Sequence, residues 1–221
     1  MSIGEIFTSL MGGFGVTVTV WVLAALIAIP AALLAGMSRL SSSRIVRFLG
    51  GVYIEFFRGT SALVQLFALF FVMPFFGLTL SPMVAGVLAL GLNEGSYGAE
   101  VVRGAIQAVP KGQSEAATAL GMSRWNRFRR VVLPQAFVEM LPPGSNLAID
   151  LLKLTSLVSL VTLSDITFEG QQLRLGAGDP LLIFAVLLSI YFFLASVISI
   201  VFSLVEGRAR RGLHTGPSRR A

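Results

Sequence analysis

The chain has 221 residues, of which 55% are hydrophobic and only 13% are charged, and it contains no cysteine. Because soluble globular domains carry about 25% charged residues, this composition excludes an ordinary soluble domain, and the lack of cysteine excludes disulfide and thiol chemistry. The formal net charge is +6, but the positions of the basic residues indicate that they face lipid headgroups rather than nucleic acid.

Charged residues are absent from three long stretches of the chain. Residues 6–38, 59–93 and 180–205 contain no Asp, Glu, Lys or Arg. An apolar run of about 20 residues is long enough to cross a bilayer as a helix. The sequence therefore predicts an all-α polytopic membrane protein with a single domain, residues 1–221, and no room for a large soluble module.

In chain order, the sequence predicts about five transmembrane helices. Residues 45–57 form an interfacial helix that Gly59, Thr60 and Ser61 interrupt before the second span. Glu55 and Arg58, three residues apart, are expected to pair there. Pro142 and Pro143 are expected to break the fourth span. The predicted spans are residues 16–37, 62–76, 83–103, 131–152 and 181–205, with a polar insert at 110–134 and a mixed segment at 153–179.

The basic residues fall in three segments that share one side of a five-span topology. The opposite side holds only Lys153 and Arg174 near its ends. Because basic residues are retained on the cytoplasmic side, we expect the N-terminus outside, the C-terminus in the cytoplasm and the polar insert facing the cytoplasm. The three segments contain Arg39, Arg44 and Arg47, then Arg103, Lys111, Arg124, Arg127, Arg129 and Arg130, and finally Arg208, Arg210, Arg211, Arg219 and Arg220.

The polar insert predicts two short helices joined by a tight turn. Ser114 is expected to cap the first helix, with Glu115 in its first turn, where the positive end of the helix dipole favours an acid. Gly121 suits the end of that helix, and Ser123 is expected to cap a second, basic helix over residues 124–132. Taken alone, the insert is also compatible with a cytoplasmic loop that lies on anionic lipid.

Polar residues inside the predicted spans indicate where a solute would pass. A charged side chain at the bilayer centre disfavours insertion by about 2.5–3.5 kcal/mol, so it normally faces protein or water. The Asp and Glu residues of two polar stripes would suit a solute with a cationic nitrogen. Glu100 with Arg103 and Asp150 with Lys153 are also spaced to form structural pairs. Two stripes have helical spacing: Asn93, Tyr97, Glu100 and Gly104, with Glu94 beside them, and Glu139, Asn146, Asp150 and Lys153.

The insert resembles the EAA signature of permease subunits in ATP-binding-cassette (ABC) importers. Its spacing is Glu115-Ala116-Ala117, three residues, Gly121, nine residues, Val131, one residue, Leu133-Pro134, with valine where isoleucine is usual. Four further stretches are similar to the polar amino-acid branch of that family: "YIEFFRGTSALVQLF" at 53–67, "LALGLNEGSYGAEVVRGAIQAVPKGQ" at 88–113, "LPPGSN" at 141–146 and "LLKLTSLVSLVTLSDIT" at 151–167. The resemblance covers about residues 16–206. Ser61 stands where proline is usual, and the form of residues 55–67 is closer to ectoine and hydroxyectoine permeases.

The resemblance implies the type I importer fold and a cytoplasmic coupling helix. The helix that carries Glu115, Ala116 and Ala117 would dock in a cleft of a separate ATPase subunit, and Gly121 would permit the sharp turn at its end. Glu115 is equally compatible with a first-turn acid that stabilises its own helix. The implied partners are two ATPase subunits, a second permease subunit, an extracytoplasmic solute-binding protein and the lipid of a bacterial inner membrane. The implied solute is a polar amino acid or a related zwitterion such as ectoine or hydroxyectoine.

The sequence has no nucleotide-binding motif. A P-loop requires Gly-x-x-x-x-Gly-Lys-Ser/Thr, whereas the only two lysines, Lys111 and Lys153, are followed by Gly112 and Leu154. We therefore expect a transport subunit that is not an enzyme and has no catalytic residue, metal or cofactor of its own, with ATP and Mg bound by the partner ATPase. Composition alone leaves open a channel or a membrane scaffold outside the ABC family.

Overall fold

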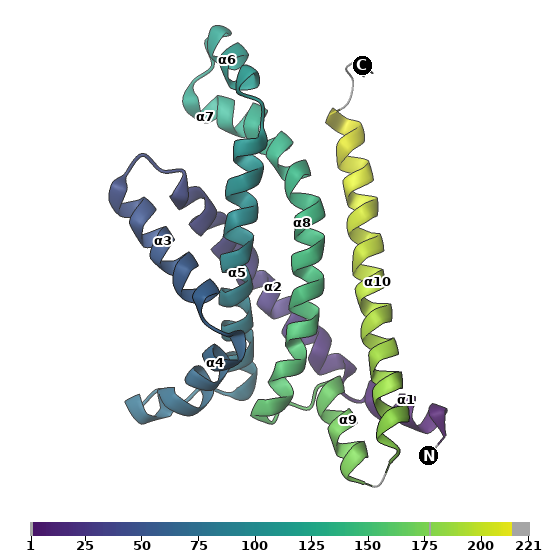
Figure 1. Ribbon diagram of the computed structural model, residues 1–221. Coiled ribbons are helices and arrows are strands. Elements are labelled where there is room, and N and C mark those ends of the chain that lie inside the picture. Colours follow the sequence, from purple (N-terminus) through teal and green to yellow (C-terminus); the bar gives the residue numbers. More distant parts are fainter. Residues whose placement is uncertain (1, 177, 214–221) are drawn as a thin grey trace.

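In the computed structural model, which describes residues 2–176 and 178–213, the regular elements are all helical. Figure 1 shows the long helices running between two ends of the molecule. Short 3-10 and π segments, labelled η, extend several α-helices. The elements are α1 Ile3–Met11, α2 Phe14–Arg39, α3 Arg44–Gly59, α4 Ala62–Phe67, η1 Ala68–Val72, η2 Met73–Phe76, α5 Pro82–Ala108, α6 Lys111–Ala119, α7 Arg124–Arg127, η3 Phe128–Val132, α8 Leu133–Leu154, η4 Thr155–Val161, α9 Ile166–Leu175 and α10 Pro180–Leu213.

Each predicted span overlaps helical structure, but only some of these helices are apolar enough to be candidate spans. Among the described residues, Phe14–Arg39, Arg124–Val161 and Pro180–Arg211 are each long and apolar enough to cross a membrane. Arg44–Gly59 and Ala62–Phe76 pass the same test together, with a bend of 100° between them. α5 has 27 residues, about 40 Å at 1.5 Å per residue, which is long enough, but it is not among these apolar candidates. The number of spans in the bilayer stays a prediction.

α2 and α5 pack against each other along most of their length, because both present small residues. A Cβ atom at Gly91 would lie 2.8 Å from the carbonyl oxygen of Ala24, and one at Gly95 would lie 2.8 Å from the Cβ of Ala31. Small residues let the backbones of membrane helices approach closely. The buried core that extends from this pair to α4 and η4 contains Val20, Leu66, Leu90 and Val158.

The bend between α3 and α4 lies where the sequence predicts an interruption. The carbonyl oxygen of Phe57 accepts hydrogen bonds from Nε2 of Gln65 at 3.0 Å and from Nδ2 of Asn93 at 2.9 Å. Gln65 also donates to the hydroxyl of Thr60 at 2.7 Å. Within a membrane, irregular backbone is tolerated only where its polar groups find partners. Asn93 on α5 therefore helps to hold the bend.

Two expectations about the spans are wrong. Pro142 and Pro143 do not break the fourth span, because α8 continues from Leu133 to Leu154 and packs along α5 and α10. Neighbouring helices can stabilise a proline-containing helix in a membrane. Glu55 and Arg58 form none of the ion pairs found among the described residues. The guanidinium of Arg58 instead lies over the ring of Tyr97, 5.4 Å from its centroid.

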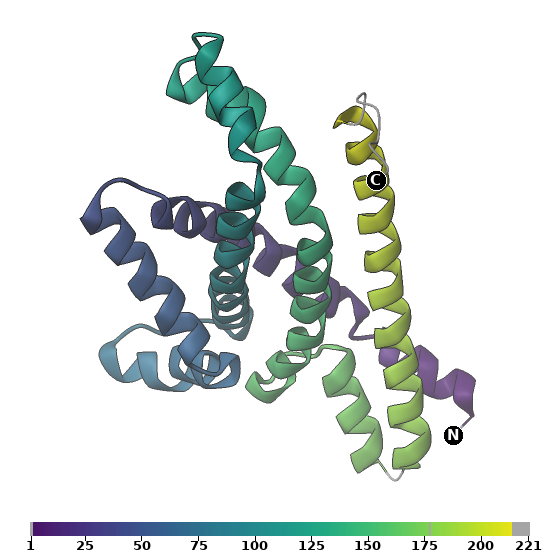
Figure 2. The ribbon, with the colours of Figure 1, turned by 45° about the horizontal axis from the view of Figure 1, so that its top comes forward.

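The basic segments that the predicted topology places on one side do lie at one end of the molecule. The loop after α2, the α6–α7 segment and the C-terminal end of α10 lie at this end in Figure 1 and in Figure 2, whereas α1 and α9 lie at the other end. The last basic residues of the tail, Arg219 and Arg220, lie outside the described residues. The grouping agrees with the prediction, and it gives the molecule a basic end.

Candidate functional site

The predicted coupling helix is present as α6, but it begins earlier than expected. The helix runs from Lys111 with Pro110 at its N-cap, so Ser114 lies inside it and does not cap it, and Glu115 lies beyond the first turn. The start is early because the amide of Gln113 already bonds to the carbonyl oxygen of Pro110 at 3.0 Å. The alternative role of Glu115 as a first-turn acid is therefore wrong, and its side chain is exposed.

The end of α6 is a tight turn that requires glycine. Gly121 has a φ of +74°, in the left-handed region, and a Cβ atom there would have no neighbour within 4 Å. The requirement therefore comes from the backbone rather than from packing. The amide of Gly121 donates to the carbonyl oxygen of Thr118 at 2.9 Å. Ser123 then caps α7, as predicted, by accepting a hydrogen bond from the amide of Asn126 at 3.3 Å.

The α6–α7 segment exposes small and apolar side chains at the basic end. Ala116 is exposed while Ala117 is buried, and Leu120 and Trp125 are 82% and 66% exposed. Large apolar side chains exposed beside basic residues indicate a surface that contacts another protein or a membrane. The sequence analysis missed Leu120 and Trp125, although two large apolar residues in an otherwise polar insert were a usable signal.

α7 continues into α8 through the π-helical segment η3. The predicted helix over 124–132 is therefore α7 followed by η3, and Arg124–Val161 forms one helical stretch of 38 residues. Arg127 also donates to the hydroxyl of Thr118, which joins α7 to α6. π segments inside helices often occur at functional sites. A displacement of α6 would thus be transmitted to the start of α8.

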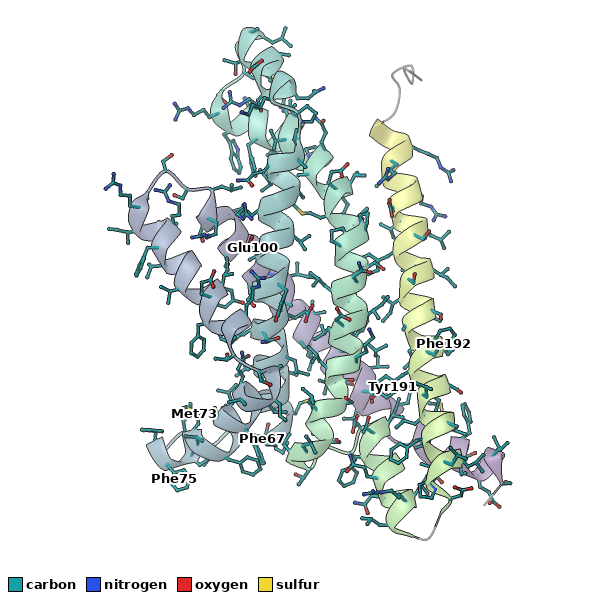
Figure 3. The ribbon with its side chains drawn as sticks, in the orientation of Figure 1. Phe67, Met73, Phe75, Glu100, Tyr191 and Phe192 are labelled. Carbon is teal, nitrogen blue, oxygen red and sulfur yellow. The ribbon has the colours of Figure 1, made fainter. Side chains whose placement is uncertain are left out.

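The predicted path residues on α5 are buried only in part, because Asn93 and Glu94 are buried, Glu100 is half-buried and Tyr97 is exposed. Asn93 is 4% exposed and holds the bend, and Tyr97 lies under Arg58. Glu100, which Figure 3 places in the half of α5 nearer α6, pairs with Arg103 at 2.6 Å. Glu94 is 6% exposed, and its Oε1 has no hydrogen-bond partner in the part of the chain that the structure describes.

The predicted path residues on α8 lie on a face that this chain does not cover. Glu139, Asn146 and Asp150 are all exposed, whereas Leu141 and Leu152 are buried on the opposite side. Asp150 forms the expected ion pair with Lys153 at 3.0 Å. Because polar side chains in a membrane normally face protein or water, this face of α8 requires a water-filled space or another subunit.

A further polar cluster, which the sequence analysis missed, lies at the end opposite α6. Asp165 caps α9 by accepting from the amide of Phe168 at 2.9 Å, and the hydroxyl of Tyr191 on α10 donates to its other oxygen at 3.4 Å. Burial raises the pKa of the Asp165 carboxyl, although these hydrogen bonds lower it. An aspartate directly before the helical run of α9 was the available signal. Among the described residues, no group of three or more His, Cys, Asp or Glu side chains could hold a metal ion.

Comparison with known sequences gives a consistent set of relatives. The sequence model of the family described as "Binding-protein-dependent transport system inner membrane component" matches residues 28–211. A probable amino-acid ABC transporter permease of Sinorhizobium fredii is 53% identical over 182 residues, which is 80% of this chain and 76% of that protein. The L-cystine permease of Bacillus subtilis is 36% identical over 203 residues, 91% of this chain and 87% of its own length. The glutamine permease of Escherichia coli is 36% identical over 180 residues, 80% and 82% of the two chains.

Comparison with solved structures shows the same fold. A chain in the crystal structure of an amino acid ABC transporter with histidines superposes with a TM-score of 0.84 and 32% identity, covering 91% of this chain and 94% of that one. A chain of the methionine ABC transporter in an inward-facing conformation gives a TM-score of 0.68 over 94% of both chains, but at 17% identity it supports the fold alone. The chain belongs to the family of binding-protein-dependent transport system inner membrane components, and it is the permease subunit of an amino-acid ABC importer, with ATP hydrolysis assigned to a separate chain.

Proposed function

We propose that the chain forms one half of a translocation path for a polar amino acid and that ATPase subunits move it through α6. The observation that carries the proposal is the α6–α7 segment, a short helix with exposed Glu115, Ala116, Leu120 and Trp125 and a turn at Gly121 that leads directly into α8. An ATPase cleft that receives α6 would cover the exposed apolar side chains. ATP and Mg would be bound there, in the partner, and closure of two ATPase subunits would displace α8 so that the spans open alternately outward and inward.

The exposed polar face of α8 supports a second permease subunit, either another copy or a sister chain. A two-fold or pseudo-two-fold arrangement of two such faces would enclose a path on the axis between them. The basic end of the molecule would face the cytoplasm, because basic residues are retained there, which places the C-terminal end of α10 in the cytoplasm and α1 outside a bacterial inner membrane. An extracytoplasmic solute-binding protein would deliver the solute to the end that carries α9.

The solute we propose carries a cationic nitrogen and a carboxylate. Glu94 on α5 and Asp150 on α8 are the acids we assign to contact with this solute, on two helices that pack against each other, and Tyr97, Glu100, Asn93 and Asn146 lie on the same two helices. The relatives named above include permeases for cystine and for glutamine, which favours a polar amino acid. An ectoine-type zwitterion is the second candidate, supported by the form of residues 55–67. A ligand screen by thermal shift on the partner solute-binding protein separates the two classes.

The docking role of α6 is tested with two matched glycine substitutions. Gly121→Ala forces a side chain into the left-handed region, which costs about 1–2 kcal/mol, so we expect less ATPase to co-purify with the permease and slower ATP-driven uptake into proteoliposomes. Gly112→Ala lies in the same short helix, with open space around its Cβ and an ordinary φ, and both values should stay at the wild-type level. Wild-type co-purification and uptake with Gly121→Ala and also with Gly121→Val would refute the docking role.

A further inference from the structure

A pocket of about 560 Å³ lies at the end of the molecule that carries α6. It is formed by the end of α5, the start of α6, η3, the start of α8 and the C-terminal part of α10. Its charged lining residues are Arg130, Glu139 and Arg210. Arg210 pairs with Glu206 on its own helix at 2.8 Å, whereas the ion pairs found among the described residues include neither of the other two. These four charges cancel, so the pocket favours pairing within the protein over a charged ligand.

α8 and α10 run in opposite directions, and a contact between them shows which of their residues lie at the same level. A Cβ atom at Gly144 would lie 3.6 Å from the ring of Phe202, so these two residues face each other. Five residues further toward the basic end, α8 has reached Glu139 and α10 has reached Gly207. At 1.5 Å per residue, each of them lies about 7.5 Å beyond the contact. Glu139 and Gly207 are therefore at about the same level.

At this level Glu139 lies beside the ion pair of α10. Glu206 directly precedes Gly207, and Arg210 follows Gly207 by three residues, which is less than one helical turn. Glu139 and Arg210 line the same pocket from two different helices. Arg130 is no alternative partner, because it lies nine residues, about 13.5 Å, from Glu139 along one continuous helix. Arg210 is thus the lining cation nearest in level to Glu139, and the carboxylates of Glu139 and Glu206 compete for it.

The two helices are apart at the level of Glu139. A Cβ atom at Gly207 would have no neighbour within 4 Å, in contrast to one at Gly144. Figures 1 and 2 show the ends of α8 and α10 separated on the side of α6. In this open arrangement Arg210 pairs with the carboxylate on its own helix. An approach of α10 to α8 would bring the carboxylate of Glu139 into the same range.

We propose that Glu139 and Arg210 form a latch that holds α8 and α10 together when the pocket closes, with Arg210 exchanging Glu206 for Glu139. The ion pair within α10 positions the guanidinium and is the competing partner in the open state. Because α8 continues from α7 and η3, a displacement of α6 changes the distance between α8 and α10 and so shifts Arg210 between the two carboxylates. This last step rests on the proposed function, whereas the exchange of partners does not.

The test follows the distance between α8 and α10 in the whole importer, reconstituted in proteoliposomes. Val138→Cys places one thiol in the lining of the pocket and Gly207→Cys places another at a similar level of α10, in a chain that has no cysteine of its own. All the charges of the pocket stay in place. The rate at which a short bifunctional maleimide joins the two thiols within one chain, measured by mass spectrometry, reports closure. It is measured without nucleotide and with ATP and orthovanadate.

Three charge variants are made in this background, and the two carboxylates should act in opposite directions. Under the condition with the slower reaction, Glu139→Gln removes the latch and should slow cross-linking about threefold, the effect expected for a half-exposed ion pair. Glu206→Gln removes the competing partner and should speed cross-linking about threefold. Arg208→Gln removes an exposed charge two residues from Arg210, on another side of α10, and should leave the rate unchanged.

The outcomes separate this inference from the proposed function. If Glu139→Gln and Glu206→Gln do not change the rate in opposite directions, or if Arg208→Gln changes it as much as they do, the latch is wrong. If the two carboxylates act oppositely but nucleotide leaves the rate unchanged in every variant, the latch stands and the proposed transmission from α6 to α8 fails.

A charge exchange tests the latch without cysteines, should the cysteine pair prevent folding. Glu139→Arg and Arg210→Glu should each slow uptake per permease molecule severalfold, because each places two like charges together at the pocket. The double variant restores an opposite-charge pair between α8 and α10 and should recover most of the uptake. A double variant that transports no faster than the single variants would overturn the latch.

Discussion

α5 and α8 both carry polar residues through an apolar protein, but they place them differently. On α5, Asn93 bonds to the backbone at the α3–α4 bend and Glu100 pairs with Arg103, so the chain supplies its own partners. On α8, Glu139 and Asn146 are exposed, and none of the side-chain hydrogen bonds or ion pairs found among the described residues includes them. Asn93 and Glu100 on α5 thus find partners within this chain, whereas Glu139 and Asn146 on α8 find none among the described residues.

The difference teaches that burial alone does not identify a solute path in a single subunit. A buried, bonded polar residue such as Asn93 maintains the fold, while an exposed polar residue in a membrane indicates a second subunit or water. Glu94 fits neither description, because it is buried on α5 and its Oε1 lacks a hydrogen-bond partner among the described residues. Because α5 packs against α8, this buried acid is the group on α5 that we assign to the proposed solute contact.

The largest effect should come from adding a single methyl group on the side of α5 that packs against α2 and α3. In Gly95→Ala, the new Cβ would lie 2.8 Å from the Cβ of Ala31 and 2.9 Å from the hydroxyl of Tyr53. Overpacking of this kind costs about 1–3 kcal/mol, so we expect a lower thermal midpoint and less protein in the membrane. Gly144→Ala on α8, where the nearest atom is 3.6 Å away, and Gly104→Ala, where none lies within 4 Å, should behave like wild type. Equal stability of all three variants would contradict the close α2–α5 contact.

The next largest effect should come from Asn93 on α5, where substitution should lower stability, whereas substitution of Asn146 on α8 should slow transport. Asn93→Ala removes a donor to Phe57 and leaves Oε1 of Gln65 without the hydrogen bond it now accepts at 3.2 Å, at a cost of about 1–3 kcal/mol. We expect its thermal midpoint to fall, measured by thermal unfolding of the solubilised protein. Asn146→Ala should keep the wild-type midpoint and instead slow uptake in proteoliposomes. If Asn146→Ala unfolds earlier than Asn93→Ala, the contrast between the two helices is wrong.

The sequence predicted contacts between residues that are close together along the chain, but it did not predict contacts between residues that are far apart. The pairs Glu100 with Arg103 and Asp150 with Lys153 were predictable because three residues on a helix fix their distance. The turn at Gly121 was predictable because a local backbone requirement selects glycine. Asn93, in contrast, reaches a carbonyl oxygen 36 residues away, and no local pattern contains that information. The expected break at Pro142 and Pro143 failed for the same reason, because helices α5 and α10, distant in sequence, support α8 there.

A smaller effect, confined to transport, is expected from the acid between the two helices. Glu94→Gln keeps the shape of the side chain and replaces a buried acid, whose Oε1 has no hydrogen-bond partner among the described residues, with a neutral amide, so the protein should be at least as stable as wild type. Uptake of L-arginine and L-glutamine should fall severalfold if this carboxylate attracts the cationic nitrogen of the solute. Glu100→Gln, whose carboxylate is already paired with Arg103, is the matched control and should slow uptake less. Equal uptake by Glu94→Gln and wild type would remove Glu94 from the proposed path.

The smallest effect concerns an acid that is buried like Glu94 but hydrogen-bonded. Burial raises the pKa of Asp165 in the folded protein above its value in the unfolded chain, which is about 3.9. Protonated Asp165 therefore contributes its full stabilisation below a pH of about 3.9. This contribution is lost as the pH rises through the raised pKa of the folded protein. Asp165→Asn keeps a good helix cap but cannot ionise. The thermal midpoint of Asp165→Asn minus that of wild type should therefore increase with pH above about 4 and level off once Asp165 is ionised in the fold. A difference that stays constant with pH would mean that the hydrogen bonds from Phe168 and Tyr191 fully offset burial, and Asp165 would then differ from Glu94 in its electrostatics as well as its bonding.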